Sequence, residues 1–102
     1  MLDDSFRYHA GELYCDAVSI RDIVNTVGTP VYIYSLGRAL TNLRRLQRAF
    51  AELGARIHYS AKANGNLSVL RALVGAGAGI DCVSGGEIFR ALQAGAKPSQ
   101  IV

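Results

Sequence analysis

The feature that most constrains the fold is a regular alternation of short apolar strands and short helices in the second half of the chain. Segments typical of strands begin at residues 57, 80 and 101, at spacings of 23 and 21 residues. Helical patterns over 67–74 and 87–94 lie between them, and each is followed by glycine. Because parallel strands need a crossover of about this length, usually a helix, the pattern predicts βα units and a parallel sheet.

The first half of the chain predicts elements of a different kind. Strand-forming residues on either side of Gly11 indicate a hairpin, and a helix is expected from Ser19 to Gly28. Residues 31–34 are wholly apolar or aromatic and predict a short strand, after which Ser35 can cap a long helix. Apolar side chains three and four residues apart indicate that helix: Leu36, Leu40, Leu43, Leu46, Phe50 and Leu53.

The length of the chain limits how much of a parallel α/β fold it can form. A closed (β/α)₈ barrel takes about 250 residues, whereas this sequence of 102 residues provides three of the strands. A parallel sheet also needs both faces covered. We therefore predict the first, truncated part of a (β/α)₈ barrel, with a small complete α/β domain as the alternative.

Composition and charge favour a folded protein of no extreme class. Half of the residues are apolar and 19% are charged, and the net charge of +3 does not by itself indicate nucleic acid. No apolar run approaches the ~20 residues that cross a membrane, and the acidic start, residues 1–4, does not resemble a signal peptide. We therefore expect a cytoplasmic protein without membrane contact. Four arginines lie beside the apolar stripe of the long helix: Arg38, Arg44, Arg45 and Arg48.

These arginines and the cysteines each leave an alternative open. The arginines are interpreted as a solvated face, with no nucleic-acid partner, because no aromatic platform accompanies them. Cys15 and Cys82 belong to no CxxC or Cys/His cluster, so no metal site is predicted. We expect both cysteines to be buried thiols in a reducing compartment, with a single disulfide as the alternative.

Lys62 is the first candidate for chemistry. It follows the predicted strand 57–61, and active sites of parallel α/β folds lie at the carboxyl ends of the strands. Because side chains alternate along a strand, His58, Ser60 and Lys62 are expected on one side, facing the barrel interior. Burial there favours the neutral amine, the form that makes Schiff bases. The alternative is a solvated lysine that opens a loop.

Further polar residues follow the next strand. Asp81 and Ser84 lie at the same end of the sheet as Lys62, where Asp81 either orients the lysine or a cofactor, or caps a helix. Glycines 85–86 begin a helix, whose free amides either hold an anion or form a plain turn. The glycine-rich segment 75–79 is not a dinucleotide loop, because it follows a helix and precedes a strand, the reverse of the Rossmann order.

Three motifs in register connect the sequence to a known family. They are GTPVYIYS at 28–35, YSAKAN at 59–64 and GIDCVSGGE at 79–87, and residues 6–13 add a fourth similar segment. In order and spacing they resemble the N-terminal region of the diaminopimelate decarboxylase family, pyridoxal-phosphate-dependent enzymes of the alanine-racemase fold. The resemblance covers nearly the whole chain.

The resemblance implies a fold, a cofactor and a reaction. Residues 1–30 would contribute to a β-domain, and residues 31–102 would form the first part of the (β/α)₈ barrel. Lys62 would bind pyridoxal 5'-phosphate as a Schiff base, and Asp81 and Glu87 would line or support the cofactor pocket. The enzyme would decarboxylate meso-diaminopimelate to L-lysine, with the cofactor ring as electron sink. Such enzymes are homodimers with shared sites, so the 102-residue chain alone is expected to have no useful activity.

Other functions stay open from the sequence alone. A decarboxylase of the same fold could act on ornithine or arginine, although Asn64 after the lysine favours diaminopimelate. A non-catalytic module could bind pyridoxal phosphate through Lys62 alone. A basic interaction domain would instead use the arginine face of the long helix.

Overall fold

The computed structural model describes residues 4–102, which divide into two compact units, one up to Arg38 and one from Ala39 to Val102. Residues 1–3, which are part of the acidic start of the chain, lie outside the described residues. The protein is a mixed α/β structure with a three-stranded antiparallel sheet and a two-stranded parallel one.

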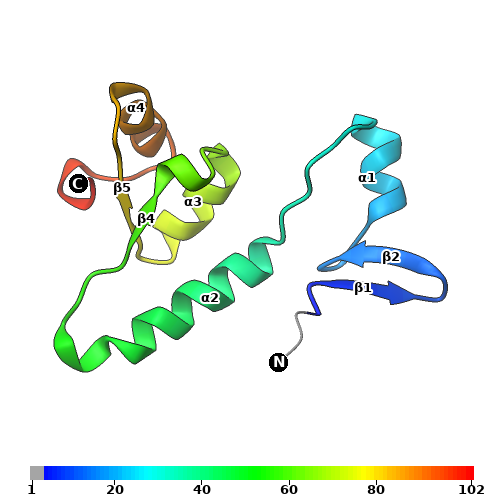
Figure 1. Ribbon diagram of the computed structural model, residues 1–102, viewed down its shortest axis with the longest axis horizontal. Helices are drawn as coiled ribbons and strands as arrows, with labels where there is room; N and C mark the ends of the chain where they lie inside the picture. The colour runs from blue at the N-terminus through cyan, green and yellow to red at the C-terminus, as the bar shows by residue number, and fades with distance from the viewer. Residues whose placement is uncertain (1–3) are drawn as a thin grey trace. The chain divides into compact units, whose positions relative to one another are not determined.

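The first unit confirms the predicted hairpin. Strands β1 (Phe6–His9) and β2 (Glu12–Cys15) pair antiparallel, and β3 (Val18–Ser19) adds to β2 (Figure 1). The turn has positive φ at both Ala10 (50°) and Gly11 (79°), which matches the twist of a two-residue hairpin. Helix α1 (Ile20–Val27) follows and ends at Gly28, as predicted.

Two serines were predicted as helix caps, and their hydroxyls behave differently. Ser35 caps helix α2 (Leu36–Ala49), because its Oγ accepts from the Arg38 N–H at 2.9 Å and donates to Asp16 at 2.6 Å. Ser19 occupies the position before α1, but its hydroxyl is buried and makes no hydrogen bond within the described residues.

Two predictions for the middle of the chain are wrong. Residues 31–34 form no strand, because strand formation needs a hydrogen-bonded neighbour and no described segment pairs with them. The long helix does not continue to Leu53. It ends at Ala49, and a 3₁₀ turn (Ala51–Leu53) follows before Gly54 in the left-handed region.

The second unit contains the predicted βα units. Strands β4 (His58–Ser60) and β5 (Gly79–Asp81) pair parallel with Tyr59 opposite Ile80, and Ile101 forms a further parallel bridge to Ile80. The connecting elements are listed in chain order: the 3₁₀ turn η2 (Ala61–Ala63), helix α3 (Leu67–Gly75), helix α4 (Gly85–Gln93) and the 3₁₀ turn η3 (Pro98–Gln100). The parallel sheet is therefore confirmed.

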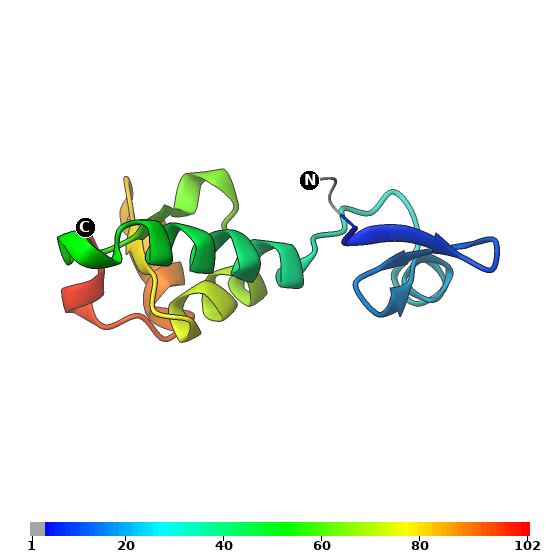
Figure 2. The same ribbon diagram turned by 90° about the horizontal axis from the view of Figure 1, so that it is seen from below.

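Helices α3 and α4 cover the same face of this small sheet (Figure 1, Figure 2). Leu70 of α3 and Ile80 of β5 are fully buried in the core between them. Burying side chains of this size stabilises a fold by about 1.5–3 kcal/mol each. The remaining core members are small, which lets the backbones approach closely: Ala61, Ala91, Ala94 and Ala96.

The other face of the sheet has a close contact near the start of β5. A Cβ placed on Gly79 would lie 2.5 Å from two ring atoms of His58 and 2.8 Å from the backbone oxygen of Gln100. Only a residue without a side chain fits between them. Glycine at this position therefore lets the His58 ring lie across the neighbouring strand.

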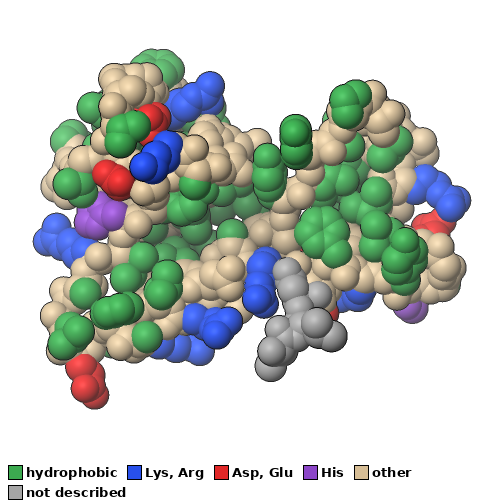
Figure 3. Space-filling view, viewed as in Figure 1, with side chains coloured by type: hydrophobic (Ala, Val, Ile, Leu, Met, Phe, Trp, Pro, Cys, Tyr) green, Lys and Arg blue, Asp and Glu red, His purple; other side chains and the backbone are tan. Residues whose placement is uncertain are grey.

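Apolar side chains are also present at the surface, as the green atoms of Figure 3 show. In the second unit, Val83 is 66% exposed and Phe89 of α4 is 63% exposed. Among the described residues, no helix combines the length and the apolar character that a membrane crossing requires.

Candidate functional site

The carboxyl ends of β4 and β5 bring most of the predicted site residues to one edge of the parallel sheet. β4 is followed directly by η2 with Lys62, and β5 ends at Asp81, three residues before Ser84. In register, Ser60 lies opposite Asp81. Since this is the edge where parallel α/β folds place reacting groups, the local topology agrees with the sequence prediction.

The expectation that Lys62 is buried on the same side as His58 and Ser60 is wrong, and the alternative of an exposed lysine after the strand agrees with the structure. The strand ends at Ser60 and η2 begins at Ala61, so the alternation of faces stops before the lysine. Ala61 is 1% exposed and packs into the core, whereas the next side chain, Lys62, is exposed. A buried residue thus fixes the backbone directly before an accessible primary amine.

Asp81 pairs with a serine rather than with the lysine. The Ser60 hydroxyl donates to Asp81 Oδ2 at 2.9 Å, across the two neighbouring strands. No ion pair joins Lys62 to a carboxylate within residues 4–102. The effect of the serine is to fix one carboxylate oxygen at the edge of the sheet.

Glu87 is held by the residue that caps its own helix. Ser84 Oγ accepts from the Glu87 N–H at 3.2 Å and donates to Glu87 Oε2 at 3.1 Å, an arrangement close to a capping box. The other carboxylate oxygen, Oε1, is buried and has no hydrogen-bond partner in the described chain. Buried acceptors are normally satisfied, so this oxygen is available to accept a hydrogen bond from a donor outside the described chain.

Cys82 lies between Asp81 and Glu87 in the sequence, and the negative charges of both acids affect the pKa of its thiol. Burial raises the pKa of its thiol above the usual value of 9.0, and the negative charges of Glu87 and Asp81 raise it further. Neither cysteine forms a disulfide in the part of the chain that the structure describes. Cys15 is buried, as expected, and Cys82 is half-buried.

Alkylation of Cys82 is expected to require higher pH than alkylation of a free thiol, because only the thiolate reacts. The experiment uses a Cys15→Ala chain and iodoacetamide, and follows the rate against pH. Glu87→Gln should move the half-maximum back only partway toward 9.0, since burial is the larger cause. A half-maximum at or below 9.0 before that substitution would contradict the assignment.

The same shift affects stability in alkaline solution. The thiol ionises less readily in the folded chain than in the unfolded chain, so its contribution is complete below pH 9.0 and is lost as pH rises beyond.

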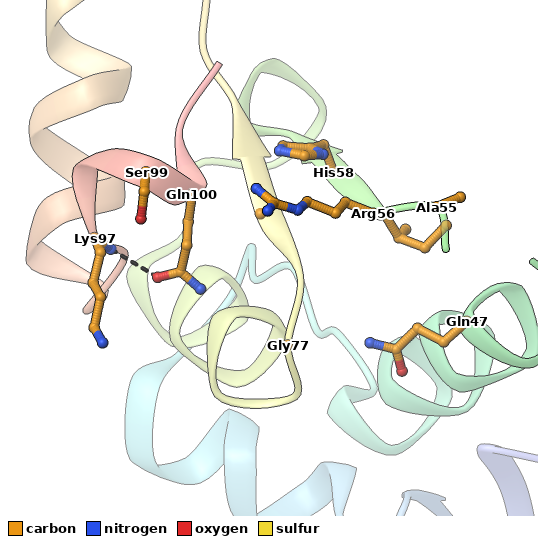
Figure 4. A pocket seen from close by; sticks show the side chains of 10 residues that line it. Gln47, Ala55, Arg56, His58, Gly77, Lys97, Ser99 and Gln100 are labelled. Atoms are coloured by element: carbon orange, nitrogen blue, oxygen red, sulfur yellow. Dashed lines mark hydrogen bonds between the residues drawn. The ribbon is translucent and has the colours of Figure 1, made fainter. Parts of the chain in front are cut away.

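A cavity of about 470 Å³ lies at the opposite, amino edge of the sheet (Figure 4). Arg56 and His58 line it from the start of β4, and Lys97 from the segment before η3, where its N–H donates to Gln100 Oε1 at 2.8 Å. Its lining includes no acidic side chain. Active sites of parallel folds form at the carboxyl edge, so this cavity lies at the other edge from the predicted site residue Lys62.

Sequence reasoning missed two contacts at or near the site. The Ser60–Asp81 bond depends on strand register, and the hydrogen bond from Arg90 to the Gly65 carbonyl joins residues far apart in the chain. The alternation of faces along 57–61 did place Ser60 beside His58, and it was the available signal for the first contact. No cluster of metal-ligating side chains is found in the part of the chain that the structure describes.

Comparison with known proteins gives a consistent match. The family model described as "Pyridoxal-dependent decarboxylase, pyridoxal binding domain" matches residues 36–102. The diaminopimelate decarboxylase of Pseudomonas fluorescens is 39% identical over 99 residues, which are 97% of this chain and 24% of that protein. The chain thus spans about a quarter of the length of the curated relatives it matches.

Comparison with solved structures agrees with the sequence comparisons. A crystal structure of a protein from Aquifex aeolicus superposes with a TM-score of 0.87 at 37% identity, covering 97% of this chain and 24% of that one. Diaminopimelate decarboxylase from M. jannaschii in co-complex with L-lysine gives 0.84 at 31% identity, covering 96% and 24%. The resemblance seen in the sequence motifs is therefore confirmed.

Proposed function

Because this chain belongs to the family of pyridoxal-dependent decarboxylases, through the pyridoxal-binding domain, we propose that it forms the first part of such an enzyme, with Lys62 as the residue that binds the cofactor covalently. One observation carries the proposal. Within the matched residues 36–102, the exposed Lys62 directly follows the buried Ala61, just after strand β4 ends at the carboxyl edge of a parallel sheet.

The residues at this edge fit pyridoxal 5'-phosphate. Lys62 offers an accessible amine that would hold the aldehyde group of the cofactor. Glu87 Oε1 offers a buried acceptor that lacks a donor. Asp81, fixed by Ser60, offers a second carboxylate at the same edge. When bound, the cofactor supplies an electron sink for the bond that breaks at the substrate's α-carbon.

We assign the chain's own residues distinct tasks in this site. Lys62 would hold the cofactor through its side-chain amine. Asp81 and Glu87 hold the cofactor and set the local charge. Ser60 orients Asp81, and Ser84 orients Glu87, so that both carboxylates keep their positions while the substrate enters.

The proposed reaction is decarboxylation of meso-diaminopimelate to L-lysine and CO₂. It is supported by relatives that carry the name diaminopimelate decarboxylase and by a structural neighbour in co-complex with L-lysine. An enzyme for ornithine or arginine is the alternative within the same fold. The substrate class common to all of these is a small amino acid.

The wider architecture is part of the same proposal. Residues 1–30 would belong to a β-domain, and residues 31–102 would begin a (β/α)₈ barrel whose first parallel pair is β4–β5. We further propose a cytoplasmic homodimer.

Labelling tests the proposal directly. The lysines of this sequence are Lys62 and Lys97, which lie at opposite edges of the sheet, and both are exposed. The chain is incubated with pyridoxal phosphate and reduced with borohydride, and the tag on each lysine is measured by peptide mass. We expect the tag predominantly on Lys62, and no rise at Lys97 in a Lys62→Ala chain. Equal tagging of both lysines would overturn the proposal.

A further inference from the structure

The turn that carries Lys62 connects β4 to α3 and is anchored at both ends. Before the lysine, Ala61 is buried in the core. After it, the Asn66 side chain caps α3 by accepting from the N–H groups of Ser68 and Val69 at 2.9 and 3.2 Å. Between these anchors, Asn64 Oδ1 accepts from the Asn66 N–H at 3.0 Å, and a contact from outside the turn restricts the backbone further.

Arg90 of α4 makes that contact. Its Nη1 donates to the backbone oxygen of Gly65 at 3.1 Å. Its Cδ lies 3.5 Å from the position that a Cβ on Gly65 would occupy, so the stem of the arginine runs along the glycine. Both the apolar stem and the guanidinium of Arg90 therefore contact the turn.

The helix that carries Arg90 is itself well fixed. The next residue, Ala91, is fully buried in the same cluster as Ala61. Arg90 also lies three residues after Glu87, hence on the same side of α4. One helix thus connects the lysine turn to the carboxylate that we assign to the cofactor.

We propose that Arg90 is a positioning residue for Lys62: by holding the Gly65 carbonyl, it keeps the lysine amine directed to the carboxyl edge of the sheet. This inference rests on the proposed function, because it concerns how Lys62 reacts with pyridoxal phosphate. Arg90 itself touches neither substrate nor cofactor in this role. Its loss should therefore change the selectivity of Lys62 rather than remove the site.

The test is the ratio of borohydride-fixed tag on Lys62 to that on Lys97 in the same sample. Arg90→Met keeps the apolar stem along Gly65 and removes the donors. Because a hydrogen bond of this kind has a modest net effect, the ratio should fall about three- to tenfold. Arg90→Gln, which keeps a shorter amide donor, should give an intermediate ratio.

Arg71→Met is the matched control, because Arg71 is an exposed arginine on the neighbouring helix α3. It should leave the ratio unchanged, and the melting temperature of each variant is measured alongside. A purely structural role for Arg90 would lower the melting temperature and leave the ratio of a folded sample as it was. That result would overturn the inference while the proposed function stands.

The remaining outcomes are equally decisive. If Arg90→Met is unfolded at the temperature of the assay, Arg90→Gln carries the test. An unchanged ratio in Arg90→Gln then counts against the inference. Equal tagging of both lysines before any substitution would overturn the proposed function, and this inference with it.

Discussion

Under the proposed function, Lys62→Ala is expected to slow the formation of L-lysine from meso-diaminopimelate by at least about 10²–10⁴-fold. The comparison is with the unchanged protein. That range is the contribution of one positioned acid–base group. It is a lower bound here, because Lys62 is also assigned covalent binding of the cofactor. The measurements are release of CO₂ and formation of L-lysine at saturating pyridoxal phosphate. Saturation ensures that a weaker hold on the cofactor does not by itself explain the loss.

Lys97→Ala is the control for this prediction. It removes the other lysine of the sequence, at the amino edge of the sheet, and should leave the rate within about twofold, as expected for a surface group away from the site. If Lys62→Ala keeps more than about a tenth of the activity, the lysine does not have the assigned role. If the protein turned over ornithine or arginine faster than diaminopimelate, the role assigned to Lys62 would stand and the proposed substrate would be wrong.

The sequence predicted local features of this fold better than features that depend on a partner. Helix α3 and its cap at Asn66 follow from residues within one short segment, and the structure has both. Residues 31–34 have the composition of a strand, yet whether they form one depends on a neighbour that composition does not specify. The parallel pairing of β4 with β5 was predictable because the crossover helix between them is itself local in sequence.

The candidate site shows the same division. Lys62, Asp81 and Glu87 were recognised from motifs, and the structure brings their elements to one sheet edge or the helix that follows it. The exposure of Lys62 was not predictable from alternation, because packing of Ala61 into the core decides where the strand ends. The bond from Arg90 to Gly65 spans 25 residues, and no local pattern indicates it.

The core beneath this edge should be the part of the second unit that is least tolerant of truncation. Leu70→Ala is expected to lower the free energy of unfolding by about 2–5 kcal/mol, the usual result of removing a fully buried leucine side chain. Leu70 is 0% exposed and packs in one cluster with Ala61, the residue before Lys62. Small domains have only about 5–15 kcal/mol in total, so such a loss removes a large part of it.

Leu53→Ala makes the same chemical change at a side chain that is 77% exposed, and it should alter stability by no more than about 0.5 kcal/mol. Urea unfolding followed by circular dichroism gives the midpoint and slope for each variant. Leu70→Met, which nearly keeps the volume, should cost less than about 1.5 kcal/mol and stays measurable if Leu70→Ala does not fold. Equal midpoints for Leu70→Ala and Leu53→Ala would show that Leu70 does not hold the core. Packing against Leu70 would then not explain the position of Ala61. It would also not explain the position of Lys62, which follows Ala61 in the chain.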